Sequence, residues 1–131
     1  MTGEGQDVPR LLLELGYWGL RRGRIAEAQV LLKGAQALLP TEPGPAMFLG
    51  MAHFAAGRYP EAERTYRQSL ERHDDDLTRS FLGESLIAQK RWAEAEETLR
   101  AVVAHNRQPA AVTFASELLT QLKRGLFQRA E

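Results

Sequence analysis

Residues 57–62 read GRYPEA, and two near-copies of this phrase stand elsewhere in the chain, GRIAEA at residues 23–28 and KRWAEA at residues 90–95. The alanines that close the three copies, Ala28, Ala62 and Ala95, are 34 and 33 residues apart. A Leu-Gly pair precedes each copy at a fixed distance and repeats with the same two spacings, at Leu15-Gly16, Leu49-Gly50 and Leu82-Gly83. Two markers that keep one period over three copies predict a tandem array of helical hairpins.

The breakers divide the chain in the same way. Pro40, Pro43 and Pro45 crowd the junction between the first two repeats, and Gly23 and Gly57 follow predicted helices. The predicted helices span about residues 9–22, 25–39, 44–56, 60–72, 77–89, 93–104 and 109–124. The predicted single domain covers residues 9–125, with repeats over about 9–42, 43–75 and 76–108 and a capping helix over 109–125. Residues 1–8 are predicted to be a flexible leader and residues 126–131 a short tail.

Each marker residue has a physical role in such an array. The small residues of the first helix (Gly16, Gly50, Gly83) and of the second helix (Ala28, Ala62, Ala95) allow the two helices of a hairpin to approach closely. Large residues are expected to fill the layer between hairpins, namely Leu15, Leu49, Leu82, Leu32, Tyr66 and Leu99. Glu27, Glu61 and Glu94 fall in the first turn of each second helix, where a carboxylate complements the helix dipole.

Composition restricts the class of function. The formal net charge is zero, with 17 basic and 17 acidic residues, which argues against nucleic acid as a main partner. No apolar stretch approaches the roughly 20 residues that cross a bilayer, and the polar N-terminus does not resemble a signal peptide. We therefore expect a cytoplasmic protein without membrane insertion. Only three of the basic residues are lysine, a bias typical of a GC-rich and hence bacterial genome.

The sequence carries no constellation typical of catalysis or metal binding. Cysteine is absent, and His53, His73 and His105 do not show metal-ligand spacing. The run from His73 to Asp76 is the one dense polar cluster, and a weak divalent cation site or a helix cap at Asp76 are both possible interpretations, of which capping is favoured. We expect no enzyme, no cofactor and no metal site.

The repeat is similar to the tetratricopeptide repeat, whose pattern of small and aromatic positions the middle copy follows best, with Gly50, Gly57, Tyr59, Ala62, Tyr66 and Ser69. The first copy has Ile25 and Leu32 where aromatic residues are usual, and the third has Lys90 in place of glycine. Asp74 and Arg107 stand where two of the closing prolines are expected. The resemblance covers residues 9–108 and implies an all-α fold, a right-handed superhelical solenoid with a concave groove.

In tetratricopeptide folds the first helix of each repeat lines this groove. The resemblance therefore implies a mainly apolar groove that binds an extended or partly helical peptide. Its predicted lining residues are Leu13, Tyr17, Leu20, Met47, Met51, Phe54, Glu84 and Ile87. The alternative is that this stripe is core, or the contact of a possible homodimer. Members that grip a C-terminal carboxylate use Lys and Asn at inner positions, where this chain has Leu13, Tyr17, Met47, Met51, Ser80 and Glu84, so that ligand is not expected.

Three stretches, residues 12–28, 47–56 and 81–99, resemble the small tetratricopeptide chaperones of bacterial type III secretion. The chaperones for translocators and those for needle or early-export subunits fit about equally. This resemblance implies a chaperone that holds an aggregation-prone export substrate in its groove. The alternative function is a structural adaptor or scaffold subunit of a larger assembly that uses the outer surfaces of the repeats.

Overall fold

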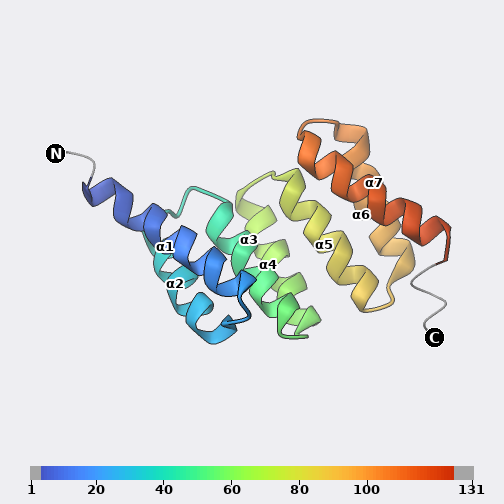
Figure 1. The fold of residues 1–131 in the computed structure, drawn as a ribbon. Helices are drawn as coiled ribbons and strands as arrows, with labels where there is room; N and C mark the ends of the chain where they lie inside the picture. The colour runs from blue at the N-terminus through green and yellow to red at the C-terminus, as the bar shows by residue number, and fades with distance from the viewer. Residues whose placement is uncertain (1–3, 126–131) are drawn as a thin grey trace.

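The computed structural model describes residues 4–125, which form an array of α-helices without a strand in that range (Figure 1). The side chains are described from Val8 onward. The helices are α1 (Glu4–Arg21), α2 (Ile25–Leu38), α3 (Gly44–Ala55), α4 (Tyr59–Arg72), α5 (Asp76–Ala88), α6 (Trp92–His105) and α7 (Pro109–Lys123). The predicted all-α fold is confirmed.

Helix α1 begins earlier than the sequence suggests. Pro9 was the expected first-turn residue, but α1 starts at Glu4 and Pro9 lies inside it. The prediction of a leader over residues 1–8 is therefore wrong for residues 4–8, which are helical. Proline favours the first turn because it lacks an N–H, yet a helix that gives up one hydrogen bond can continue past it. Residues 1–3 and the predicted tail at 126–131 lie outside the described part.

The three hairpins share one turn geometry. In each, the first residue beyond the turn donates its backbone N–H five residues back: Arg24 to Gly19 at 2.8 Å, Arg58 to His53 at 2.9 Å and Arg91 to Leu86 at 3.0 Å. This is the bond of a Schellman motif, which needs a left-handed residue just past the helix. Gly23 (φ 79°) and Gly57 (φ 78°) supply it, and Lys90 adopts the same conformation (φ 62°) where the third repeat has lost its glycine.

The small residues in the first helices make the close approach that the sequence predicts. A methyl group added to Gly50 would lie 2.2 Å from Cε1 of Tyr66 in α4. The same addition would lie 2.7 Å from Leu32 at Gly16 and 2.5 Å from Leu99 at Gly83. Each glycine therefore receives one large side chain of the second helix, and the hairpin is closed by that contact.

Two clusters of buried side chains form the core. One lies between the first two repeats and contains Leu20, Ala28, Leu32, Leu49 and Ala52. The other runs from α4 to α7 around Tyr66, Leu86, Leu99 and Val102. The prediction that Leu15 fills a layer between hairpins is wrong, because its side chain is 47% exposed. Leu15 lies on the outer side of α1, a face that no other described element covers.

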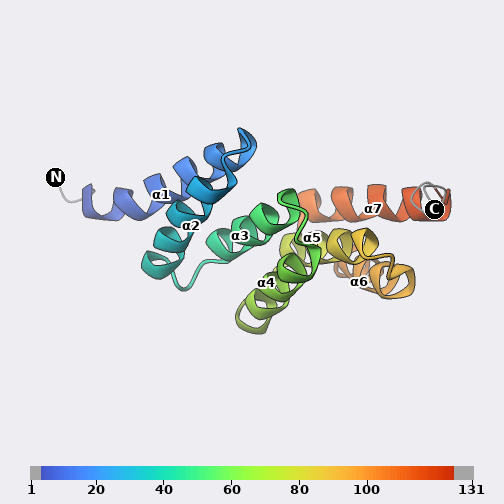
Figure 2. The same ribbon diagram turned by 90° about the horizontal axis from the view of Figure 1, so that it is seen from below.

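The helices form two layers. Figures 1 and 2 show α1, α3, α5 and α7 along one side of the molecule, with α2, α4 and α6 behind them. Contacts between α1 and α3, α3 and α5, and α5 and α7 hold the first layer together. The first layer is thus a continuous face built from the first helix of each repeat and from α7.

Candidate peptide-binding groove

A pocket opens in this face where α3, α5 and α7 meet. Its volume is about 370 Å³. Its walls are mainly apolar, and they include three of the predicted groove residues, Phe54, Glu84 and Ile87. The pocket is completed by Ala88, Lys90, Trp92, Leu118 and Gln121. Phe54 is half-buried and packs against the larger core cluster, so an apolar side chain that enters the pocket would extend the core outward.

Glu84 places a carboxylate in this apolar pocket. No hydrogen bond or ion pair joins it to another residue of the described range 8–125. Burial raises the pKa of Glu84 to about 7, and no nearby cation opposes that effect. Removing a charged carboxylate from water costs free energy unless a partner compensates it. The pocket therefore has one polar group that a bound cation or N–H donor would satisfy.

Tyr66 lies beneath the same face. Its side chain is fully buried, and its hydroxyl has no hydrogen-bond partner among the described residues. Burial raises the pKa of this phenol, and the neighbouring charge of Glu84 raises it further. Tyr66 thus remains a neutral phenol at physiological pH, and it supports the floor of the groove next to the acid.

The predicted groove residues of the first two repeats lie between α1 and α3. Leu20 and Met47 are buried, at 9% and 8% exposure, and Leu13 and Met51 pack partly buried against the smaller core cluster. Tyr17 contacts the Phe48 ring at 5.1 Å between centroids, and its hydroxyl accepts a hydrogen bond from Arg21 at 2.8 Å. The structure therefore brings Phe54, Glu84 and Ile87 together in one pocket, and it places the other five in the helix–helix seam beside it.

Two pocket residues were not among the predicted groove residues. Leu118 lies 34 residues after Glu84, and Gln121 lies 34 residues after Ile87. Their signal was therefore the repeat period itself, extended by one copy into α7. Trp92 was expected only to seal the joint between repeats, but it also lines the pocket. Helix α7 acts both as a cap and as the last wall of the groove.

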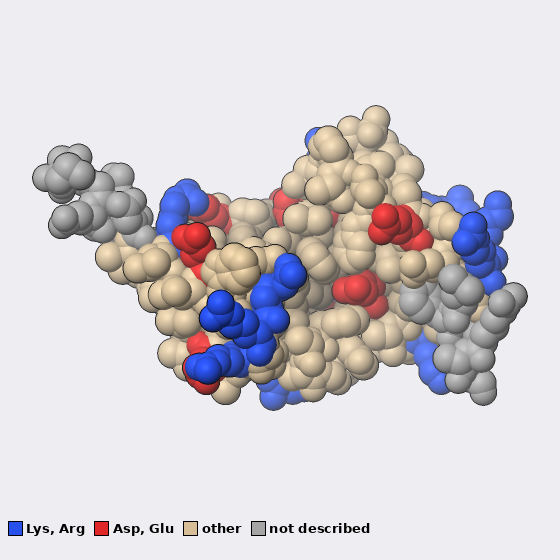
Figure 3. All heavy atoms as spheres, viewed as in Figure 1, with Lys and Arg blue, Asp and Glu red and all other residues tan. Residues whose placement is uncertain are grey.

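Charge is sparse in the middle of this face. Figure 3 shows uncharged atoms over most of it, with carboxylates near the centre. Basic side chains gather at the end of α1, where Arg21, Arg22 and Arg24 follow one another. The pattern is that of an apolar surface with a central acid and a basic margin.

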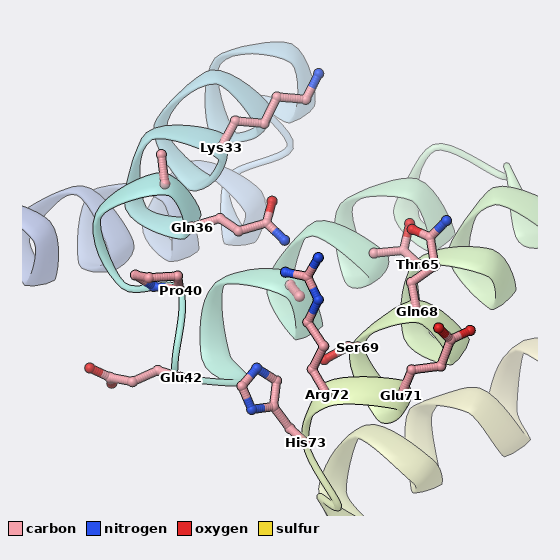
Figure 4. A pocket seen from close by; sticks show the side chains of 12 residues that line it. Lys33, Gln36, Pro40, Glu42, Thr65, Gln68, Ser69, Glu71, Arg72 and His73 are labelled. Atoms are coloured by element: carbon pink, nitrogen blue, oxygen red, sulfur yellow. The ribbon is translucent and has the colours of Figure 1, made fainter.

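A second hollow, of about 670 Å³, lies between α2 and α4, on the other layer (Figure 4). Its walls carry both signs of charge, with Lys33 and Arg72 opposite Glu42 and Glu71. Ser69 lines it, but the Ser69 hydroxyl is buried and has no partner among the described residues. Mixed charges and few apolar walls are typical of a solvated seam between successive helices.

The acidic run at residues 74–76 is an ion-paired cluster. Arg107 donates two hydrogen bonds to the Asp76 carboxylate, each 2.9 Å, and His105 Nδ1 lies 2.9 Å from the same group. Arg107 also reaches Asp74 at 2.9 Å. These bonds lower the pKa of Asp76 far below its usual range and that of Asp74 to about 2.

The predicted cap at Asp76 is wrong by one residue. Asp75 is the N-cap of α5 and accepts a hydrogen bond from the Thr78 backbone at 2.9 Å. Because Asp75 takes that role, Asp76 is free to turn toward Arg107 and is buried. Within residues 8–125 no group of three or more acidic or histidine side chains is arranged to hold a metal ion.

No helix in the described range is long and apolar enough to cross a membrane. Family models described as tetratricopeptide repeat match residues 20–80 and residues 77–101. No curated protein matches the sequence.

Several solved structures share the fold. The type III secretion chaperone SycD of Yersinia enterocolitica, in complex with a peptide of the translocator YopD, is 20% identical, with a TM-score of 0.76 over 89% of this chain and 93% of that chain. The first TPR domain of human RPAP3 is 17% identical, with a TM-score of 0.79 over 94% and 95%. The first TPR of Spaghetti (RPAP3), bound to the HSP90 peptide SRMEEVD, is 17% identical, with a TM-score of 0.76 over 92% and 94%. At these identities the likeness concerns the fold.

Proposed function

The chain is a tetratricopeptide repeat protein, and from this premise we propose that it is a chaperone that holds an apolar segment of a client protein in its concave groove. We place it in the bacterial cytoplasm, with a type III secretion substrate as its client. The role is binding and not catalysis.

One observation carries the proposal: an apolar pocket in the middle of the groove contains a single unpaired carboxylate. Phe54, Ile87 and Trp92 supply apolar walls, and Glu84 supplies one polar group that fixes orientation. Apolar walls with few convergent polar groups are the usual composition of a binding site. The tightly packed seam between α1 and α3, with Met47 and Met51, continues this surface toward the first repeat.

The chemistry of the groove favours an internal client segment over a C-terminus. A terminal carboxylate needs cations or amide donors, whereas the inner positions carry Met51, Ser80 and Glu84. The HSP90 peptide bound by one structural neighbour ends in two acidic residues, valine and aspartate as printed, and such a ligand would bring negative charge to Glu84. We therefore propose a client segment with bulky apolar residues and at least one lysine, arginine or free backbone N–H.

The type III assignment rests on two supports that agree. The stretches at residues 12–28, 47–56 and 81–99 resemble the secretion chaperones in sequence, and SycD shares the fold over most of both chains. The competing function is an adaptor in a larger assembly. The two differ in where the partner binds, which one substitution can separate.

Replacing Phe54 with glutamate is expected to abolish client binding. The variant loses a side chain whose burial contributes about 1.5–3 kcal/mol, and it places a second carboxylate next to Glu84. Affinity should fall by at least about 100-fold. The measurement is co-purification of the tagged protein from its native cell, with partners identified by mass spectrometry.

The matched control is Val30→Glu, because Val30 is apolar, 71% exposed and outside the pocket. A single export protein that is lost with Phe54→Glu and kept with Val30→Glu supports the groove chaperone. Several subunits of one assembly that remain bound to both variants would replace it with the adaptor.

Substituting Glu84 with glutamine is expected to weaken client binding and to remove a pH dependence of stability. Burial raises the pKa of Glu84 from its ordinary value to about 7 in the folded state. The folded protein then binds more protons than the unfolded chain, so the free energy of unfolding falls as the pH rises from about 4.5 to 7. Glutamine lacks this titration, so the variant should be more stable than the parent above pH 7 and should show a flatter profile.

Urea unfolding between pH 5 and pH 8 tests the stability part of the prediction, and isothermal titration with the identified client segment tests the binding part. Unchanged client affinity in Glu84→Gln would show that the carboxylate does not contact the client, and it would leave the apolar part of the groove proposal standing.

A further inference from the structure

Helix α1 carries an apolar stripe on its outer side. Val8, Leu11, Leu15 and Trp18 follow one another at intervals of three or four residues, which places them on one side of a helix. Their exposed fractions are 50%, 52%, 47% and 52%. We call these four residues the α1 face. Scattered apolar residues on a surface need no explanation, but a contiguous stripe that ends in tryptophan marks a contact surface.

The repeat period shows what this face is built for. Moving along the chain by one and two repeats carries Leu11, Leu15 and Trp18 onto positions of α3 and α5 that are all buried. Those positions are Pro45, Leu49 and Ala52 in α3, and Thr78, Leu82 and Ser85 in α5. There α3 packs against α2, and α5 packs against α4. The same side of α1 is therefore shaped for a helical neighbour, and no element within residues 8–125 provides one.

The side chains of the α1 face exclude a simple copy of the internal packing. Trp18 stands where the later repeats have Ala52 and Ser85, so an ordinary hairpin in the same position would meet the indole ring. The other end of the array does not fit either. The outer side of α7 exposes Thr113, Glu117, Thr120 and Arg124, and stacking it on Trp18 would bury charged groups against an apolar surface.

The stripe is complementary to itself. A two-fold axis that crosses α1 between residues 14 and 15 sets two such helices antiparallel. Leu11 of one copy then lies opposite Trp18 of the other, twice, and the two Leu15 side chains meet near the axis. An isologous contact of this kind uses the same patch on both subunits and closes the assembly at two.

We propose that two copies of this chain dimerise through the α1 face, with their α1 helices antiparallel. The inference does not rest on the proposed chaperone function, because none of the four residues lines the pocket at Phe54 and Glu84. It gives the dimer predicted from the sequence a surface different from the groove, which stays open on both subunits. Four apolar side chains per copy form a small interface, so we expect a dimer that dissociates on dilution.

The test is sedimentation equilibrium of the purified full chain between about 1 µM and 1 mM, a range that covers weak association. The parent should change from monomer to dimer within this range. Trp18→Asp should raise the dissociation constant by at least about 100-fold, because each dimer loses two central aromatic anchors. Two controls, Val30→Asp and Phe54→Glu, should leave it unchanged, since Val30 is exposed away from the α1 face and Phe54 lies in the groove.

A parent that stays monomeric throughout, or a dimer that survives Trp18→Asp, overturns the proposal, and loss of the dimer in Phe54→Glu would move the contact to the groove. Should Trp18→Asp fail to fold, Trp92→Phe leaves Trp18 as the single tryptophan of the chain. Its emission should shift to the blue as the dimer forms, and emission that does not change with concentration also overturns the proposal.

Discussion

Replacing Gly50 with alanine is expected to lower the free energy of unfolding by about 2–3 kcal/mol, although the same change stabilises most helices by about 1 kcal/mol. The added methyl group would lie 2.2 Å from Cε1, 2.6 Å from Cδ1 and 2.7 Å from Cζ of Tyr66. The Tyr66 ring is rigid and fully buried, so it cannot move aside. Either α3 and α4 separate or the ring leaves its rotamer, and both responses cost packing.

Gly34→Ala is the matched control, since Gly34 also lies within a helix, and its nearest neighbour would be Cδ1 of Leu12 at 3.4 Å. This variant should be as stable as the parent or slightly more stable. Urea unfolding followed by far-ultraviolet circular dichroism measures both. Equal stability of the two variants would show that the α3–α4 contact is loose.

A double variant refines the argument. The first and third repeats place Leu32 and Leu99 where the second has Tyr66. Tyr66→Leu combined with Gly50→Ala should therefore lose less than the sum of the single changes, because a leucine side chain can turn away from the methyl group. Additive losses would place the cause of the Gly50→Ala effect elsewhere in α3.

The period of the sequence predicted the fold because it records contacts within a hairpin. Gly50 and Tyr66 are neighbours along one hairpin, and the same pairing recurs at Gly16 and Gly83, so a single sequence reveals it three times. Likewise the left-handed turn at Gly57 recurs at Lys90, although the residue type has changed. What repeats along the chain is visible without the structure.

The period fails where the array ends. Leu15 has the same local sequence as Leu49 and Leu82, but its exposure depends on the presence of a neighbouring hairpin, which no local pattern encodes. The groove shows the same limit. Leu20 and Met47 were predicted from the position in the repeat, and their burial between α1 and α3 depends on the angle at which those helices cross.

Contacts between distant charged residues are also outside the reach of the repeat. Asp74 and Arg107 drew notice only as departures from the usual proline. They face each other across the junction of α5 with the α6–α7 loop, 33 residues apart, and both contribute to one cluster with Asp76. Two positions that lose the same consensus residue can be a pair, but only the structure shows that these are.

Substituting Asp76 with asparagine is expected to lower the free energy of unfolding by about 3–5 kcal/mol, because removing one partner of a buried ion pair leaves the others uncompensated. The Asp76 side chain is 1% exposed and binds Arg107 in a two-bond geometry, with Arg79 and His105 on the same carboxylate. Asparagine keeps the shape but carries no charge, and its amide group would meet the arginine donors. Asp74 still pairs with Arg107, so the loss should lie toward the lower end of the range.

The pH dependence provides a second signature of the same residue. Hydrogen bonds from Arg107, followed by those from His105 and Arg79, outweigh burial and hold the pKa of Asp76 far below its usual range. A carboxyl whose pKa is lowered on folding stabilises the protein fully above its ordinary value of about 3.9, and this contribution is lost as the pH falls further. The parent should therefore lose stability steeply below about pH 4, and Asp76→Asn should show a flatter acid limb.

The control is Glu96→Gln, which removes an exposed pair with Arg100 at 2.7 Å whose side chains are 49% and 71% accessible. A pair in that setting contributes about 0.5 kcal/mol or less, so this variant should follow the parent at neutral pH and in acid. Urea unfolding at pH 7 and at pH 3.5 distinguishes the two sites. If Asp76→Asn and Glu96→Gln cost the same at pH 7, the cluster does not hold the third repeat to α7. The groove wall at Leu118, which α7 supplies, would then depend on the apolar contacts of Ala111, Ala115 and Leu118 alone.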